Sequence, residues 1–308
     1  MIVSYPSFAV SDTTPNTISD TVSSPSAYSP LINTEQGFEY VPADGSYYND
    51  DYAQDFVRCT QHFAHGVLPV LDRDLQSDTY PLCFYQFAVM YSGKTRTAVY
   101  VAQHLTREQV STARQLERVD NFHPESRLPT GVRADIKDYR GTGYDRGHLA
   151  PNGDMSNQQS QFDSFSLANI VPQDSTHNRE LWREIESVTR DLADNYGEIY
   201  VITGTAFADT QVDKVGKIFV PTHLYKVVYV PSIAQAAVYY SANQAGASYE
   251  VLDVQELTAR TGVNVLPNVQ VSLLPLPSVY REQEQDAQAV SWREFIRHVW
   301  DYLWQALG

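Results

Sequence analysis

The sequence contains no uninterrupted apolar run of about 18 residues, so it predicts no transmembrane helix. Cysteine is scarce as well, because Cys59 and Cys83 are the only two in 308 residues. Two readings stay open for them: a disulfide made in an oxidising compartment, or two buried free thiols. The first residues lack the basic and long apolar stretches of a signal peptide. Three possibilities are therefore expected: the protein is cytosolic, it is exported by another route, or a signal peptide was removed before the numbering begins.

Positive charge is also in short supply. The net charge of -15 argues against a polyanionic partner, which usually requires a basic surface. The deficit is uneven, however: residues 1–54 hold seven acidic and no basic residues, whereas residues 55–190 hold 17 acidic and 15 basic residues. A divalent cation in the nearly neutral middle segment would further reduce repulsion of phosphate. Composition thus permits a nucleic-acid substrate and predicts loose, salt-sensitive binding.

The chain divides into three regions. Residues 1–54, which are acidic and rich in Ser, Thr and Pro, predict an arm or linker. Residues 55–275 predict an α+β domain, a central antiparallel β-sheet with helices on both sides. Residues 276–308 have the spacing of an amphipathic helix; packing on its own domain is the favoured reading, and docking to a partner or membrane surface the alternative. The strand candidates, rich in β-branched and aromatic residues, are 82–92, 95–105, 197–207, 216–231 and 235–243.

Two internal helices are expected. The first covers residues 106–119, with Thr106 as N-cap. The second covers about 177–194 and has a core-facing stripe with an amide at its head. A polar residue on a buried helix face needs a partner or faces a site. Members of the stripe lie within about 40° of Asn178 at 100° per residue: Asn178 itself, Trp182, Ile185, Thr189 and Leu192.

The most informative stretch is YDRGHLAPNGDM (144–155), followed by SLANIVPQDSTHNRELWREIE (166–186). Its pattern predicts strand, loop, strand and helix, with His148 opposite the start of the helix, where Asn178 lies. Phosphodiester cleavage needs a general base, for which a neutral imidazole is suited near pH 7. It also needs a hard cation held with open positions, which Mg²⁺ tolerates because it retains water ligands.

These segments resemble the DNA/RNA non-specific endonuclease family, which includes mitochondrial endonuclease G and secreted bacterial nucleases. Its DRGH motif stands at 145–148, and its second signature appears as Asn178, Trp182 and Glu186. Two motifs in the right order, with the connecting run matched, are far more specific than DRGH alone. The resemblance covers residues 55–275 and implies an embedded ββα-metal (His-Me) finger. The connecting run matches at Phe165, Leu167, Asn169, Pro172 and Gln173.

Carried over position by position, the resemblance implies that His148 activates the attacking water. Asn178 contributes its side-chain oxygen to Mg²⁺, for which Mn²⁺ is expected to substitute, and Glu186 orients a metal-bound water. Arg146 and Arg190 would contact the scissile phosphate. Asn169 would support the site through hydrogen bonds, and Arg96, on the second strand of the early hairpin, would add a phosphate contact.

Each of these residues also has a structural interpretation. His148 alone is typical of a hydrogen-bonded structural histidine, and Asn178 of an N-cap or first-turn residue. Glu186 fits a solvated helix position, and Arg146 and Arg190 fit ion pairs.

The remaining polar residues carry less chemistry. His177 points about 100° away from Asn178 on a helix, so it is expected at the surface or behind the site. Asp145 is expected to be structural. His62 and His65 lack the accompanying Cys or carboxylate pattern of a zinc site.

The function implied is Mg²⁺-dependent, sequence-independent hydrolysis of DNA and RNA to 5′-phosphate products, because backbone contacts carry little base information. The alternatives are a phosphodiesterase with a narrower substrate and a non-catalytic nucleic-acid-binding module. A periplasmic or secreted location is favoured. The partners expected are nucleic acid and an inhibitor or immunity protein, and a homodimer stays open.

Overall fold

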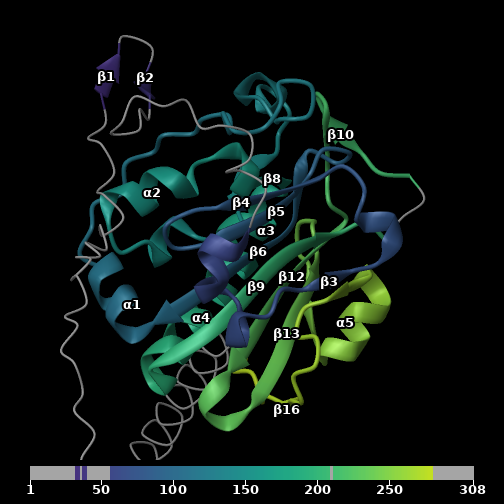
Figure 1. Cartoon of the computed structure of the whole chain (residues 1–308). Helices are drawn as coiled ribbons and strands as arrows, with labels where there is room; N and C mark the ends of the chain where they lie inside the picture. The colour runs from purple at the N-terminus through teal and green to yellow at the C-terminus, as the bar shows by residue number, and fades with distance from the viewer. Residues whose placement is uncertain (1–31, 35–36, 40–55, 209–210, 280–308) are drawn as a thin grey trace, which may run out of the picture. The chain divides into compact units, whose positions relative to one another are not determined.

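The computed structural model describes residues 32–34, 37–39, 56–208 and 211–279 (Figure 1). Within the predicted arm, β1 (Ile32–Thr34) and β2 (Gly37–Glu39) pair as an antiparallel hairpin, which belongs to a first unit of residues 1–47. The rest of that arm, and residues 280–308 of the predicted C-terminal helix, lie outside the described residues. No helix in the described part is long and apolar enough to span a bilayer.

The second unit is built on one large sheet. Its path runs β14-β13-β12-β9-β6-β5-β4 with antiparallel neighbours throughout, and β16 pairs in parallel with β13. This confirms the predicted α+β fold with a central antiparallel sheet. The strands are β4 (Thr79–Cys83), β5 (Ala88–Ser92), β6 (Thr97–Thr106), β9 (Glu198–Ala206), β12 (His223–Val230), β13 (Gln235–Ala242), β14 (Tyr249–Leu252) and β16 (Ser272–Leu273).

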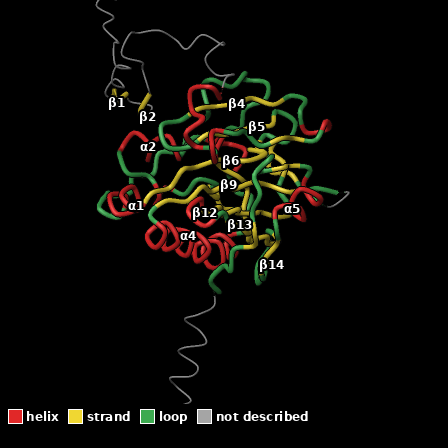
Figure 2. The backbone as a smooth tube through the Cα atoms, turned by 60° about the horizontal axis from the view of Figure 1, so that its bottom comes forward, coloured by secondary structure: helices red, strands yellow, loops and turns green. Residues whose placement is uncertain are grey.

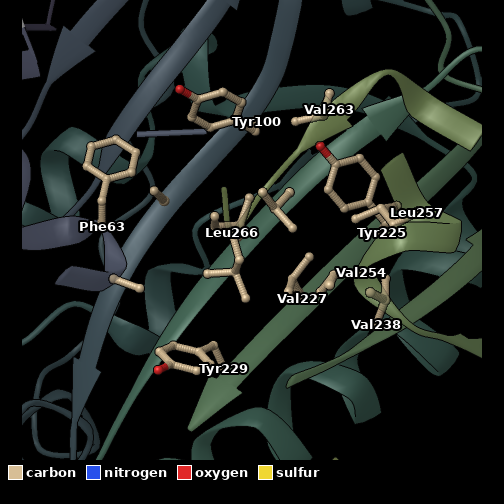
Figure 3. Close-up of a cluster of buried hydrophobic side chains, with 14 of the residues drawn as sticks. Phe63, Tyr100, Tyr225, Val227, Tyr229, Val238, Val254, Leu257, Val263 and Leu266 are labelled. Atoms are coloured by element: carbon tan, nitrogen blue, oxygen red, sulfur yellow. The ribbon is translucent and has the colours of Figure 1, made fainter. Parts of the chain in front are cut away.

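Both faces of the sheet are buried, because side chains alternate between two cores along each strand. Val227 packs in the core under α5 (Val254–Thr261), which Figure 3 shows with Leu257 close to the strand residues. Val228 points the other way, into the core beneath α1 (Arg107–Ala113) and α4 (Arg183–Tyr196), which lie side by side in Figure 2. Helices therefore cover both faces, as expected.

Three predicted elements differ from the structure, one of them the 216–231 segment, which divides into β11 (Ile218–Phe219) and β12 (His223–Val230). The 82–92 segment is not one strand: β4 ends at Cys83, and the chain turns through Phe84–Phe87, where the Phe84 N–H donates to the Phe87 carbonyl at 2.9 Å. The two rings stack with centroids 4.4 Å apart, so aromatic residues that favour strands here stabilise a turn. The first helix begins at its Thr106 cap as predicted but ends at Ala113, six residues early.

Shorter elements complete the unit. The small strands are β3 (Val70–Leu71) with β15 (Val263–Asn264), β10 (Lys214–Val215) with β11 (Ile218–Phe219), and β7 (Asp145–His148) with β8 (Ile170–Gln173). The helices are α2 (Gln158–Ser164), α3 (Ser175–His177) and the π-helix η8 (Asn178–Trp182). The 3₁₀ turns are η2 (Phe56–His62), η3 (Ala64–Gly66), η4 (Arg73–Leu75), η5 (Ile136–Tyr139), η6 (Asn152–Asp154), η7 (Leu167–Asn169) and η9 (Pro231–Ile233).

The two cysteines form a disulfide, which decides between the two readings of the sequence. Cys59 in η2 bonds to Cys83 at the end of β4, with Cα atoms 5.8 Å apart. The bond ties the first described helix of the second unit to the edge strand of the sheet.

We expect removal of this disulfide to destabilise the fold. The bond closes a loop with a sequence separation of 24, so Cys59→Ala/Cys83→Ala should lower the free energy of unfolding by about 3 kcal/mol through the entropy of the unfolded chain. Urea denaturation measures the change. Dithiothreitol should reproduce it in the wild type and have no effect on the double variant; equal stability of both proteins would contradict the prediction.

Candidate active site

The DRGH segment is the first strand of a ββα unit. The strands β7 and β8 pair in register from Asp145 opposite Gln173 to His148 opposite Ile170, and the chain then enters α3, η8 and α4. Gly147 lies so close to β8 that an added Cβ atom would be 2.0 Å from the Gln173 side-chain oxygen. The predicted order of strand, loop, strand and helix is confirmed.

His148 lies in an aromatic setting at the end of β7. The residue is partly exposed, yet its Nε2 atom is buried and has no hydrogen-bond partner within the described ranges. The ring centroids of Phe165 and Phe122 lie 5.0 and 5.5 Å from its own. Burial, helped by the nearby charge of Arg118, lowers the pKa of His148 to about 3. The imidazole is therefore neutral at pH 7, which is the state that a general base requires.

Asn169 fixes the chain just beyond His148. Its amide nitrogen donates to the carbonyls of Ala150 (2.9 Å) and Ser164 (2.8 Å), and its oxygen accepts from the Ala150 N–H at 2.9 Å. The side chain is fully buried, so these bonds are not exchanged for water. Asn169 thus holds the backbone beside the histidine, as the supporting role predicts.

Asn178 lies at the start of η8, one turn into the helix. The N-cap is Asp174, whose carboxylate accepts from the N–H groups of Thr176 and His177, so Asn178 belongs to the first turn and is not the N-cap. The Asn178 Nδ2 donates to the Asp145 Oδ2 at 3.0 Å. Because the amide nitrogen is bound, the other end of the amide, Oδ1, is left without a protein partner among the residues described.

Asp145 is itself anchored. Arg179 donates to its two oxygens through Nη2 (2.7 Å) and Nε (2.8 Å), although the arginine is largely exposed. Burial raises the pKa of Asp145, but the hydrogen bonds from Arg179 and Asn178 outweigh it and hold that pKa below its ordinary value. The carboxylate is therefore charged at neutral pH and serves to orient Asn178, which fits the structural role expected for Asp145.

Four charged side chains, two of them from α4, form a cluster that includes Glu186. Arg190 pairs with the buried Asp154 at 3.1 Å, so its ion-pair interpretation is confirmed. Glu186 interacts electrostatically with both and with Lys226, and burial raises its pKa above the ordinary value against the pull of Lys226 and Arg190. Glu186 is therefore not the solvated helix residue of the alternative interpretation.

The other arginines differ. Arg146 is exposed, and its guanidinium carbon lies 3.9 Å from the Phe122 ring centroid. Arg96 is not on a strand: it has a positive φ of 58° in the turn before β6 and donates to the carbonyls of Gly131 and Arg133. Turn geometry overrides the strand propensity of its neighbours, and its guanidinium braces a loop.

The sequence pattern did not indicate the surroundings of three residues. Of the two positions expected for His177, the surface is wrong: the side chain is buried and bonds to Gln173 (2.8 Å) and Ser241 (3.1 Å). Arg118 acts electrostatically on both His148 and Glu186 from a loop with no recognisable motif. Lys226 is buried in β12; a lysine inside the apolar run HLYKVVYV was the available signal.

The donor set at the site fits one kind of metal. The residues that the structure describes contain no group of three or more His, Cys, Asp or Glu able to hold a cation. Zinc normally takes several such ligands and Ca²⁺ six to eight oxygens. A single amide oxygen suits Mg²⁺, which keeps most of its waters.

Comparison with known proteins decides the family. Residues 71–272 match the family model of DNA/RNA non-specific endonucleases. The chain belongs to this family. The fold also matches a solved structure, the complex of EndoG with EndoGI, with a TM-score of 0.56, 24% identity, and coverage of 65% of this chain and 91% of that one. At that identity the match supports the fold alone.

Curated relatives are nucleases. A nuclease of Nostoc sp. is 32% identical over 65% of this chain and 79% of its own length. Nuclease C1 of Cunninghamella echinulata is 32% identical over 47% of this chain and 63% of its own. The human mitochondrial nuclease EXOG is 26% identical over 70% of this chain and 57% of its own. The chain thus spans less than two thirds of the latter two.

Within this nuclease, we expect Gly147→Ala to damage the site. The new methyl group would collide with Gln173, push β7 away from β8 and displace His148. A displacement of about 1 Å costs roughly 100-fold in rate, and overpacking lowers stability by about 1–3 kcal/mol. Plasmid nicking and urea denaturation measure the two effects. Gly131→Ala is the control, since nothing lies within 4 Å of its Cβ position; equal rates in the two variants would contradict the expectation.

The buried imidazole makes stability depend on pH. The unfolded chain takes up a proton at His148 near pH 6.5, the folded protein only near pH 3. The stabilisation is therefore complete above pH 6.5 and is lost as pH falls toward 3. From pH 7 to pH 5, the difference in unfolding free energy between wild type and His148→Gln should shift toward the variant by about 2 kcal/mol. Urea denaturation at each pH tests this, and the contributions of the other histidines cancel because both proteins contain them. A difference that stays constant between pH 7 and pH 5 would show that the His148 ring is exposed.

Proposed function

We propose that this nuclease is a Mg²⁺-dependent endonuclease that hydrolyses DNA and RNA without sequence preference and leaves 5′ phosphates. The observation that supports it best is the neutral His148, whose buried Nε2 has no protein partner among the described residues, in one ββα unit with the oriented amide of Asn178. The family membership and the named nucleases support hydrolysis of phosphodiesters in general.

In this mechanism, the His148 imidazole takes a proton from water as the water oxygen attacks phosphorus. The bond from phosphorus to the 3′ oxygen breaks and that oxygen takes a proton from solvent water, so the products carry a 5′ phosphate and a 3′ hydroxyl. A phosphate next to the ring adds negative charge and raises the proton affinity of His148 from its depressed value. This makes the base stronger when substrate is bound than in the free protein.

Asn178 is the protein ligand in this proposal, with its Oδ1 free because Asp145 holds the amide nitrogen. Glu186 would orient a water bound to the metal ion. When bound, Mg²⁺ would neutralise charge on the phosphate and on the leaving oxygen; Mn²⁺ is expected to substitute.

Low specificity follows from the side chains at the site. The exposed Arg146 and the nearby Arg118 offer charge to a phosphate backbone, which is common to DNA and RNA. Arg190 is partly committed to Asp154, so it would act on phosphate by charge more than by contact.

Location and partners are part of the proposal. The Cys59–Cys83 disulfide supports an oxidising compartment, the periplasm or the cell exterior. The fold neighbour EndoG was solved with EndoGI in a study of its inhibition, which supports a protein inhibitor as a partner here too.

The decisive experiment is nicking of supercoiled plasmid with Mg²⁺ titration, run beside single-stranded DNA and RNA. His148→Ala should lose about 10²- to 10⁴-fold in rate, the usual contribution of a general base, and bind Mn²⁺ as the wild type does. Asn178→Ala should need more Mg²⁺ and be partly rescued by excess. The matched control is His104→Ala, a histidine bound to Glu198 at 2.8 Å on β6, which should cut normally.

EDTA should abolish cutting, and the products should be ligated without kinase treatment. Cleavage of one polymer only would favour the narrower phosphodiesterase. Binding without cleavage would favour the non-catalytic module. Undiminished cutting by His148→Ala would refute the mechanism.

A further inference from the structure

The side chain of Lys226 is buried in the centre of the nuclease, although lysine is rarely buried without a partner. It is 1% exposed and projects from β12 toward the ββα unit. Its Nζ donates to the Thr203 hydroxyl on β9 at 2.6 Å and to the Leu149 carbonyl at 3.5 Å, the upper limit for such a bond. The shorter of the two bonds, to Thr203, holds the ammonium group against the sheet.

This one group reaches both halves of the candidate site. Leu149 follows His148 directly, and the Lys226 Nζ also lies 5.4 Å from the centroid of the Trp182 ring. Trp182 is fully buried in η8, four residues after Asn178 and four before Glu186. Lys226 therefore sits where the sheet, the histidine loop and the helix that carries the other site residues meet.

Charges of both signs surround it. Two acids, Glu186 and Asp154, and two bases, Lys226 and Arg190, interact in this cluster. Removal of the Lys226 charge would leave the two carboxylates with less positive charge beside them in a medium of low dielectric, where like charges repel strongly. In support, burial lowers the pKa of Lys226, and the charges of Glu186 and Asp154 oppose that shift.

Burying a charged lysine side chain in the protein interior is energetically unfavourable. Replacing a whole buried ion pair by apolar side chains of similar size is often neutral or even stabilising, so stability alone gives no reason for a charged cluster here. We propose that Lys226 is a positioning residue of the nuclease site, which holds the Leu149 backbone beside His148 and supplies the positive charge that fixes the Glu186 side chain. This rests on the proposed roles of His148 and Glu186.

The test compares Lys226→Met with wild type in the full chain. The side chains are similar in length, but the variant removes one buried charge, so the melting temperature should fall and activity is compared well below it. Loss of a residue that orients site groups from behind typically costs about 10- to 100-fold, so kcat on supercoiled plasmid with Mg²⁺ should fall by that factor. The KM for plasmid should stay within about twofold, because a buried side chain does not reach the substrate.

Two further variants show whether the effect is specific. Tyr225→Phe is the matched control: it precedes Lys226 on β12, is equally buried, and faces the opposite core, so kcat should be unchanged. Thr203→Val keeps the lysine but removes the hydroxyl that holds its Nζ, and should lower kcat by a smaller factor. It also carries the test if Lys226→Met does not fold.

A double-variant cycle separates this inference from the proposed function. If Lys226 acts through Glu186, Lys226→Met should slow Glu186→Gln much less than it slows the wild type. In the metal-free protein, the ¹⁵N shifts of the His148 ring should change in Lys226→Met and not in Tyr225→Phe. If Glu186→Gln cuts normally, the proposed role of Glu186 fails. If Glu186→Gln is impaired but kcat is normal in Lys226→Met, or the two effects simply multiply, the role of Lys226 is refuted.

Discussion

The geometry of the site depends on three buried hydrogen bonds of one side chain. Asn169 joins the Ala150 backbone, on the loop after His148, to the Ser164 carbonyl at the end of α2. Each unsatisfied group in such a place would cost about 1–3 kcal/mol, so the loop has one favourable conformation. That conformation sets where β7 ends, and therefore where the imidazole lies relative to the helix that follows β8.

An acidic protein can carry such a site because its acidic and basic residues are unevenly distributed. The site cluster contains charges of both signs, with Arg190 and Lys226 beside Asp154 and Glu186. Exposed arginines, among them Arg146 and Arg179, lie on the ββα unit. Screening at about 10 Å in 0.1 M salt limits the reach of distant acidic residues, so the net charge of -15 says little about the field at the site.

Much of this could be predicted from periodicity and motif. The DRGH strand, the β8 strand and the buried stripe from Trp182 to Leu192 follow from local patterns, and all are present. The turn at Arg96, the burial of His177 and the position of Lys226 depend on contacts between distant segments; His177, for example, bonds to Ser241 on β13. Local propensity contains no information about such partners, although a lysine within an apolar strand does indicate a buried charge.

The start of the helix shows why Asn178 is free for chemistry. Asp174 binds the first N–H groups, so no capping demand falls on the Asn178 side chain. From Asn178 to Trp182 the helix has π geometry, which is rare and recurs at functional sites. The wider turn carries Asn178 toward Asp145 on β7, while the fully buried Trp182 keeps the helix against the sheet. Burial of a large ring, roughly 1.5–3 kcal/mol for side chains of this kind, offsets the weaker helical turn and leaves the amide pointing into the site.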